Sequence, residues 1–510
     1  PIYQEIPNLS AAKSAYGNIV YRKAPSFLRQ AEFYLGEDKF QTAVRAFLKK
    51  HEFANAEWTD LVTEFQNTSW LKDELGYKNS NATDKAKYEE ASRNTIRLWA
   101  DVWVKSRGLP IVRVGENGRT PGIIISQEDK LEQKKHSDLW TLNFNVLFKY
   151  KNGKGIIKHQ FLDFEGEEVE FADLEIKEKP VFIFPNYQDY GYGIFLLDEK
   201  SRAYVLANIQ NEKDDFLRTM MWGSLWDSVR EAELPPLDYV ALVIKNINVE
   251  PDESTIQTLL GRVSTAMNYY LSDAQSKELA AQIETLLIEK MQNAPTLGLR
   301  ITFYRAFLNV ASTEKAKQTL KEVLSGKFEI KDLKLKTKDK FDIITRLSIL
   351  GDKDAPNLLA ELEKSETSDE AKRYAYAAKA GIATTENKAK FYNDFTGNKE
   401  LSESWIETAF VAFNSPKHAE LTLPYLEKAL AELPNLKKNR KIFFINGWLG
   451  AFIGGQKSEQ ALAIVNKFLV DNPNLDKDLR LKILENADGL ERAVKIREKF
   501  NLTRQITPKD

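Results

Sequence analysis

Residues 14–36, SAYGNIVYRKAPSFLRQAEFYLG, decide how the rest of the chain is organised. The stretch opens as a short connector that carries two tyrosines, Tyr16 and Tyr21. Pro25 then predicts the start of a helix, because proline fits the first helical turn, where a backbone N–H has no partner. Apolar residues recur at helical spacing after this proline, and Gly36 predicts the end of the helix. Two phenol side chains are therefore expected just ahead of an amphipathic helix.

Helical patterns continue to residue 108. Residues 37–50 carry apolar side chains on one side, and Asn55 is a predicted N-cap for the helix that follows. The polar stretch 66–94 is predicted to be a partly helical surface insertion. The next helix is expected to stop at Gly108-Leu109-Pro110.

From residue 109 the apolar spacing changes from helical to alternating. Asn152-Gly153 is a strong hairpin signal between two of the alternating segments. The pattern predicts strands at 111–114, 122–126, 139–150, 155–162, 167–171, 180–185 and 192–198. Several short strands separated by turns indicate an antiparallel β-sandwich over 109–208.

Residues 209–510 read as helices broken by polar turns. The pattern includes helices at 254–270, 275–290, 296–311, 314–325, 339–350, 355–364, 402–413, 417–432, 440–453, 458–471 and 476–500. Short amphipathic helices in succession predict an all-α, HEAT-like solenoid of irregular repeats. The whole chain is thus expected to be a multidomain α+β protein with domains at 1–108, 109–208 and 209–510.

Composition narrows the classes of function. The net charge of −1 argues against a general nucleic-acid binder, which needs a basic surplus. No apolar run approaches the length of a membrane span. The chain has no cysteine, which excludes disulfides and thiolate metal sites but does not fix the compartment. A periplasmic or other extracytoplasmic location is favoured over a cytoplasmic one.

Three segments resemble the aminopeptidase-N-like zinc aminopeptidases, the gluzincins. V-Y-R-K at 20–23, followed by an apolar helix, is similar to the V-Y-E-K-G of that family, although Ala24 replaces its usual glycine. Residues 40–62 and the W-A-D-V-W-V-K-S-R-G-L-P of 99–110 extend the match. The resemblance implies that 1–108 is the helical remainder of a thermolysin-like catalytic domain.

The same resemblance places Tyr21 on the catalytic tyrosine of the family. Its hydroxyl would face the oxyanion that forms when zinc-bound water attacks a peptide carbonyl, and such a donor strengthens as charge develops. Without the surrounding pattern, Tyr21 would read as one packing residue among 19 tyrosines. Tyr16 is interpreted as part of a pocket wall.

The zinc ligands of the family are not visible in this sequence. H-E-F-A-N at 51–55 begins like the zincin motif, but Asn55 stands where the second histidine would complete an i, i+4 pair. The other histidines, His136, His159 and His418, are isolated. We therefore expect no metal or cofactor site in this chain, zinc in an intact parent enzyme, and a zinc-bearing segment ahead of Tyr21 that is missing here.

Two functions remain open at this point. The first is the C-terminal portion of a zinc aminopeptidase that releases N-terminal residues from peptides. This portion would supply Tyr21 and a helical cap over the active site, and by itself would be inactive. The alternative is a non-catalytic scaffold that binds proteins on the concave surface of the solenoid.

Overall fold

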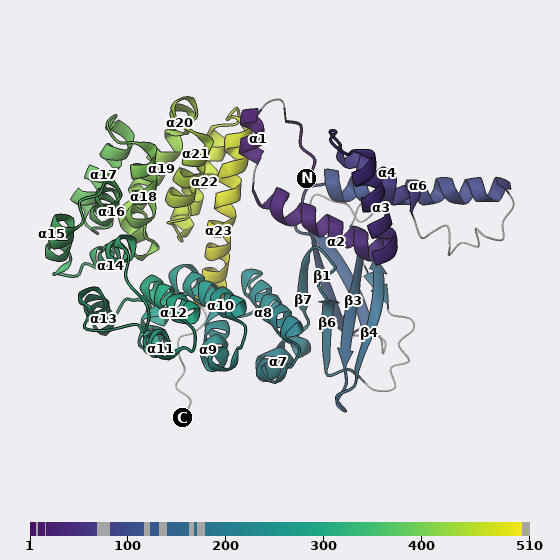
Figure 1. Cartoon of the computed structure of the whole chain (residues 1–510), viewed down its shortest axis with the longest axis horizontal. Coiled ribbons are helices and arrows are strands. Elements are labelled where there is room, and N and C mark those ends of the chain that lie inside the picture. The colour runs from purple at the N-terminus through teal and green to yellow at the C-terminus, as the bar shows by residue number, and fades with distance from the viewer. Residues whose placement is uncertain are drawn as a thin grey trace. The chain divides into compact units, whose positions relative to one another are not determined.

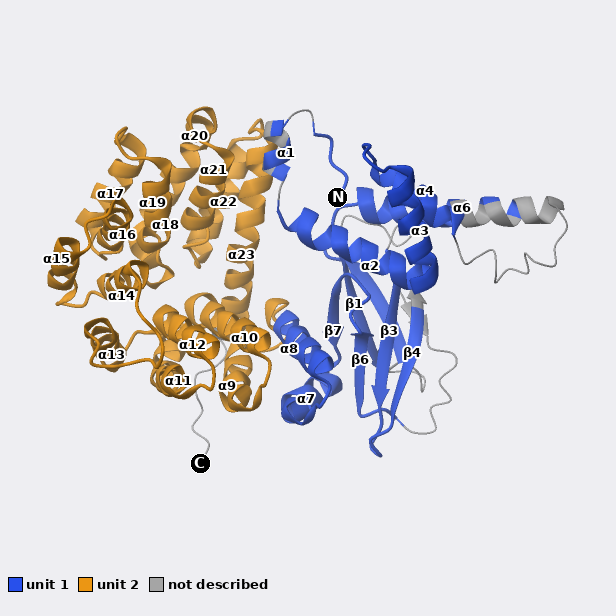
Figure 2. Ribbon diagram, viewed as in Figure 1, with its two compact units in different colours: residues 1–228 blue, residues 229–510 orange. Residues whose placement is uncertain are grey.

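Helices open and close the chain, and strands lie between them (Figure 1). The structure is a computed structural model of the 510-residue chain. It describes residues 1–6, 9–15, 17–68, 82–116, 123–131, 140–162, 168–170 and 179–501. The chain divides into two compact units, residues 1–228 and 229–510 (Figure 2). The division into three domains stays a prediction.

The helices of unit 1 begin with a short helix and a wide turn. They are α1 (Leu9–Ala15), the π-helical turn η1 (Ile19–Lys23), α2 (Ala24–Leu35), α3 (Glu37–Lys50), α4 (Trp58–Asn67), α6 (Ala82–Lys105), α7 (Glu199–Asn208), the 3₁₀ turn η4 (Ile209–Asn211) and α8 (Asp215–Arg230), which continues into unit 2. The predicted end of α2 is confirmed, since Gly36 has a φ of 83°. Of the predicted insertion at 66–94, residues 69–81 lie outside the described residues, and residues 82–94 form the first part of α6.

Two local predictions in this helical part are wrong. Tyr21 does not lie in a connector, because residues 19–23 already form a helical turn that runs into α2. The N-cap of α4 is Glu57 and not Asn55, and the backbone N–H of Glu57 donates to Oδ2 of Asp60 over 2.8 Å. The carboxylate of Asp60, at the third helical position, thus reaches back to the amide of the N-cap residue, which is one half of a capping box.

The strands form two sheets. They are β1 (Pro110–Glu116), β2 (Ile123–Asp129), β3 (Leu142–Lys149), β4 (Gly155–Leu162), β5 (Glu168–Glu170), β6 (Phe182–Tyr187) and β7 (Ile194–Leu197). One sheet has the order β5-β2-β1-β7 and the other β4-β3-β6. The predicted hairpin is confirmed, because Gly153 has a φ of 81° between β3 and β4.

Strand direction differs from the prediction at one pair. The other described pairs are antiparallel, but β1 and β7 run parallel, with Val112 opposite Phe195. A long stretch of chain separates these two strands, so no tight hairpin forces them to run in opposite directions. The two sheets contribute to one apolar core, in which the rings of Phe144 and Phe195 are 5.2 Å apart.

Unit 2 consists of helices among its described residues. They are α9 (Pro236–Asn246), η5 (Ile247–Val249), α10 (Glu253–Thr265), η6 (Ala266–Tyr270), α11 (Asp273–Asn293), α12 (Leu297–Val310), α13 (Glu314–Ser325), α14 (Thr337–Ile349), α15 (Ala355–Ser365), α16 (Asp369–Ala380), α17 (Thr385–Gly397), α18 (Glu403–Phe413), η7 (Pro416–His418), α19 (Ala419–Ala431), α20 (Leu433–Asn439), α21 (Ile442–Phe452), α22 (Glu459–Asp471) and α23 (Lys477–Asn501). Helices α10, α12, α14, α16, α18, α21 and α23 form a row in which each contacts the next.

Two of these helices, α16 and α17, fall within the region predicted to be helical, although their bounds were not among those given. Each begins at a hydroxyl N-cap that accepts from the third amide beyond it: Ser368 from Ala371, and Thr384 from Asn387. Serine and threonine are preferred N-cap residues, so the sequence itself carried a signal for the start of both helices.

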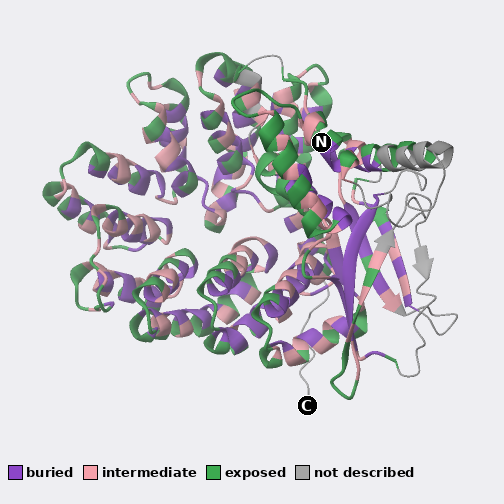
Figure 3. Cartoon of the chain, turned by 45° about the vertical axis from the view of Figure 1, so that its right-hand side comes forward, coloured by how far each residue is buried: buried purple, intermediate pink, exposed green. Residues whose placement is uncertain are grey.

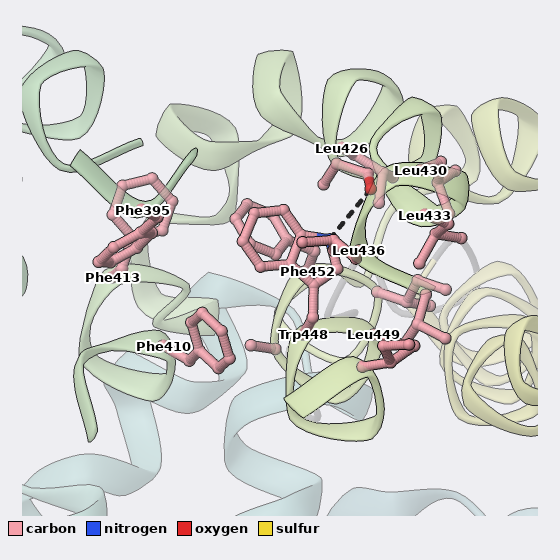
Figure 4. Close-up of a cluster of buried hydrophobic side chains, with 14 of the residues drawn as sticks. Phe395, Phe410, Phe413, Leu426, Leu430, Leu433, Leu436, Trp448, Leu449 and Phe452 are labelled. Carbon is pink, nitrogen blue, oxygen red and sulfur yellow. Dashed lines mark hydrogen bonds between the residues drawn. The ribbon is translucent and has the colours of Figure 1, made fainter. Parts of the chain in front are cut away.

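The core of unit 2 is rich in aromatic side chains (Figure 4). Trp448 is fully buried, its ring lies 4.4 Å from that of Phe452, and its Nε1 donates to the carbonyl of Ala429 over 3.0 Å. Buried residues lie on the sides of the helices that face neighbouring helices, and exposed residues lie on the outer sides (Figure 3). Packing between helix layers therefore stabilises this unit.

Candidate functional site

Tyr21 lies in the middle of the π-helical turn η1, directly ahead of α2. The N–H of Ala24 donates to the carbonyl of Ile19, five residues back. Pro25 explains the wide turn, since it has no N–H to donate to the carbonyl of Tyr21 four residues back and its ring crowds that carbonyl. Tyr21 is 67% exposed, so the turn presents its side chain at the surface of unit 1.

Helix α2 supports this turn and is fastened to the sheets through a buried amide. Gln30 is fully buried, and its Nε2 donates to the carbonyl of Asn143 over 2.8 Å and to the carbonyl of Tyr190. Its Oε1 accepts from the N–H of Asn143 over 3.2 Å. Sequence reasoning did not identify Gln30, although a polar residue among the apolar positions of a helix was a visible signal.

The loop after β6 packs against the same helix. Arg29 donates to the carbonyls of Gln188 and Asp189 over 2.9 and 3.0 Å, and its guanidinium lies 4.6 Å from the ring centre of Tyr190. Phe33 stacks on Tyr190 at 4.1 Å. Burial raises the pKa of the Asp189 carboxyl, while Arg29 partly opposes this. Tyr190 therefore packs on α2.

Each histidine in the described ranges has its own structural setting. His51 is the C-cap of α3. His159 lies on β4 with its ring centre 5.0 Å from that of Phe33, and Nε2 of His418 donates to the carbonyl of Ile349 over 2.8 Å in unit 2. His136 lies outside the described residues.

The described part of the chain does not fit a zinc ion. Within it, no three His, Asp or Glu side chains are grouped so that they could hold a metal. Tyr21, the predicted catalytic residue, can be placed, whereas Tyr16, which was predicted to be part of a pocket wall, lies outside the described residues. Helices long and apolar enough to cross a membrane are likewise absent from the described ranges.

Two family models match the chain. The Peptidase family M1 domain matches residues 1–78, which include Tyr21, and the ERAP1-like C-terminal domain matches residues 182–492.

Curated relatives agree with these matches. Aminopeptidase N of Streptomyces lividans is 25% identical over 508 residues, which are 97% of this chain and 56% of that protein. Aminopeptidase M1-D of Oryza sativa subsp. japonica is 27% identical over 220 residues, 42% of this chain and 22% of that protein. Aminopeptidase A of Gloydius brevicauda is 25% identical over 153 residues, 30% of this chain and 14% of that protein. The chain thus spans just over half the length of the Streptomyces relative and a smaller share of the other two.

Proposed function

Because this chain belongs to the aminopeptidase-N-like M1 peptidase family, we propose that it is part of an enzyme that releases N-terminal residues from peptides. Within that enzyme, the hydroxyl of Tyr21 is proposed to stabilise the transition state. The observation that carries this role is the exposure of Tyr21, 67%, on a helical turn inside the segment matched by the M1 domain. A tyrosine buried in the core could not reach a substrate.

The proposed chemistry is the donation of one neutral hydrogen bond. As the carbonyl of the scissile peptide becomes tetrahedral, negative charge develops on its oxygen, and a donor already aimed at that position binds the charge more tightly than it binds the ground state. Loss of one such donor typically costs on the order of 10²–10³ in rate. The chain's own contribution is therefore a correctly oriented phenol.

We assign the zinc ion and the residues that bind the substrate to the intact enzyme. Since the described residues do not fit a metal, we propose that another segment of the parent holds the zinc and that unit 1 binds this segment. Peptides are the proposed substrates. We further propose that the two sheets are a β-sandwich and that the row of helices in unit 2 is a HEAT-like solenoid that restricts access to the active site; the shared core of the sheets and the stacked helices support these assignments.

A scaffold that binds other proteins is the competing function, and the stacked helices of unit 2 are the feature that favours it. The coding sequence upstream of residue 1 distinguishes the two. An H-E-x-x-H followed by a glutamate in the same reading frame would support the enzyme, and a frame without this motif would support the scaffold.

The substitution Tyr21→Phe in the intact parent enzyme tests the catalytic role. We expect zinc content and KM to stay near those of the wild type, and kcat to fall by about 10²–10³ because only the donor is removed. Tyr3→Phe is the matched control, since Tyr3 is also exposed in unit 1, at 48%. Near-normal kcat in Tyr21→Phe would show that this tyrosine is misassigned.

A further inference from the structure

Lys23 ends the turn that carries Tyr21 and is only 2% exposed. Its Nζ donates to the backbone carbonyl of Ser106 over 2.9 Å and lies 4.9 Å from the ring centre of Trp140. Ser106 follows the last residue of α6, and Trp140 lies just ahead of β3. One side chain therefore joins the turn to two elements that are distant in the sequence.

The partners of Lys23 are themselves held rigidly. Trp140 is fully buried and its ring lies 4.9 Å from that of Trp103, which is also fully buried. Nε1 of Trp103 donates to the carbonyl of Thr141 over 3.1 Å. The lysine is thus anchored on the packed core of unit 1 and not on a surface loop.

Lys23 supplies the buried anchor of this turn. Lys23 is the one buried residue among 19–23, all five of which the structure describes, while Val20 and Tyr21 are 41% and 67% exposed. Ile19 is the only partly buried apolar residue of the turn, and Pro25 removes an ordinary helical hydrogen bond at the end of the turn. The contacts of Lys23 therefore give the backbone that carries Tyr21 a buried link to the core of unit 1.

We propose that Lys23 is a positioning residue for Tyr21. By fastening the end of the turn to Ser106 and Trp140, it fixes the direction in which the phenol leaves the backbone. The lysine does not touch the substrate; it acts through the tyrosine. This inference rests on the proposed function and adds to it the residue that aims the donor.

A double-mutant cycle in the intact parent enzyme tests the inference. Lys23→Met removes Nζ and keeps a side chain of similar length. We expect kcat to fall by roughly 10- to 100-fold with little change in KM, because small displacements of a catalytic group can cost about 10²-fold. In the Tyr21→Phe background, the same substitution should lower kcat less than about 2-fold, because the aimed hydroxyl is already gone.

Lys149→Met is the matched control. Lys149 also lies in unit 1, pairs with Glu212 and lies 6.0 Å from the ring centre of Phe182, so its loss perturbs the fold away from the turn. Any effect of Lys149→Met on kcat should be equal in both backgrounds. The inference would be overturned if Lys23→Met lowered kcat equally in the wild-type and Tyr21→Phe backgrounds. It would also be overturned if Lys23→Met alone kept full kcat. Full kcat in Tyr21→Phe would instead overturn the proposed function.

Hydrogen exchange of this chain by itself gives a readout that needs neither metal nor turnover. The amide of Ala24, bonded to Ile19, should exchange at least about 10-fold faster in Lys23→Met and in Lys23→Gln, because the turn opens more often. Amides in the middle of α3 should keep their protection in both variants. Wild-type protection of Ala24 in either folded variant would contradict the proposal.

Discussion

At the level of single residues, polar side chains inside unit 1 fix where the apolar ones pack. Gln30 sits on the buried side of α2 and yet satisfies three backbone groups, two of Asn143 and one of Tyr190. An apolar side chain there would leave these groups buried without partners, and each such group costs about 1–3 kcal/mol. The amide therefore determines how α2 docks on β3.

We expect Gln30→Leu to lower the free energy of unfolding of unit 1 by on the order of 3 kcal/mol, for the reason just given. Urea denaturation followed by intrinsic fluorescence measures this change as a lower midpoint. Gln41→Leu makes the same chemical change at an exposed position of α3, and it should stay within about 0.5 kcal/mol of the wild type. Similar stabilities for the two variants would show that Gln30 contributes no specific hydrogen bonding.

The sequence was informative about Tyr21 but not about its supports. The V-Y-x-K pattern singled out Tyr21 through its resemblance to a family motif, and the catalytic role of this tyrosine stays a prediction. The buried positions of Lys23 and Gln30 depend on Ser106, Trp140 and Asn143, which lie many residues away. Contacts of that range leave no periodic signal in a single sequence, so the assignment of the supporting residues required the fold.

At the level of elements, one ion pair fastens the end of β3 to the segment that precedes α8. Nζ of Lys149 bonds the carboxylate of Glu212, whose other oxygen accepts from the N–H of Asp214 over 3.0 Å. Burial opposes ionisation of Glu212, but the bonds from Lys149 and from the amides of Asp214 and Lys213 outweigh it and lower the pKa of Glu212 below 4.5. The link is therefore strongest when the carboxyl is ionised.

The pH dependence of this link follows from the direction in which folding shifts the pKa of Glu212. Because the pKa of Glu212 is lower in the folded than in the unfolded chain, its stabilisation is complete above pH 4.5 and is lost as the pH falls through the folded value. We expect Glu212→Gln to lower the free energy of unfolding by about 1–2 kcal/mol at pH 6, a value reduced for the partial exposure of the pair. Urea denaturation at pH 6 and pH 3 should show this difference shrink towards zero. A difference that persists unchanged at pH 3 would exclude the ionised link.

Local periodicity predicted the elements better than it predicted their partners. The alternating segments became β1 to β7, and the glycine after α2 ended that helix. The parallel pairing of β1 with β7 was not predicted, because strand direction is chosen after the chain has made a long excursion. The π-helical turn was also missed, since proline spacing alone does not distinguish a loop from a widened helical turn.

At the level of the whole molecule, both units bury lysine side chains, and the consequences differ. In unit 1, Lys23 fastens the exposed turn that carries the proposed catalytic group. In unit 2, Lys388 is 1% exposed, its Nζ donates to the carbonyl of Ala380 at the end of α16 over 2.9 Å, and it lies 5.0 Å from the ring centre of Phe413. Burial lowers the pKa of Lys388 from 10.5 to about 8.

Because the pKa of Lys388 is lowered, the free energy of unfolding of unit 2 should change with pH in the alkaline range. Below pH 8 the folded chain has to keep a charged ammonium in its interior, and between about pH 8 and 10.5 the unfolded chain binds more protons than the folded one. The free energy of unfolding should therefore rise with pH across that window, by on the order of 2 kcal/mol from this group. Lys388→Met removes the charge and should stabilise unit 2 at pH 7 by about 1–3 kcal/mol, as apolar replacements of buried charges often do.

Hydrogen exchange of α17 in urea, measured at pH 7 and pH 9.5, tests this expectation on the unit concerned. In the wild type, the amides of α17 should become more protected between pH 7 and pH 9.5, after correction for the intrinsic exchange rate. In Lys388→Met, these amides should be more protected at pH 7 than in the wild type and should gain little protection at pH 9.5. Lys390→Met, a change at an exposed lysine of the same helix, should follow the wild type at both values. If Lys388→Met instead lowers protection at pH 7, the hydrogen bond to Ala380 outweighs the cost of burying the charge, and Lys388 stabilises the junction of α16 and α17 in its ionised form.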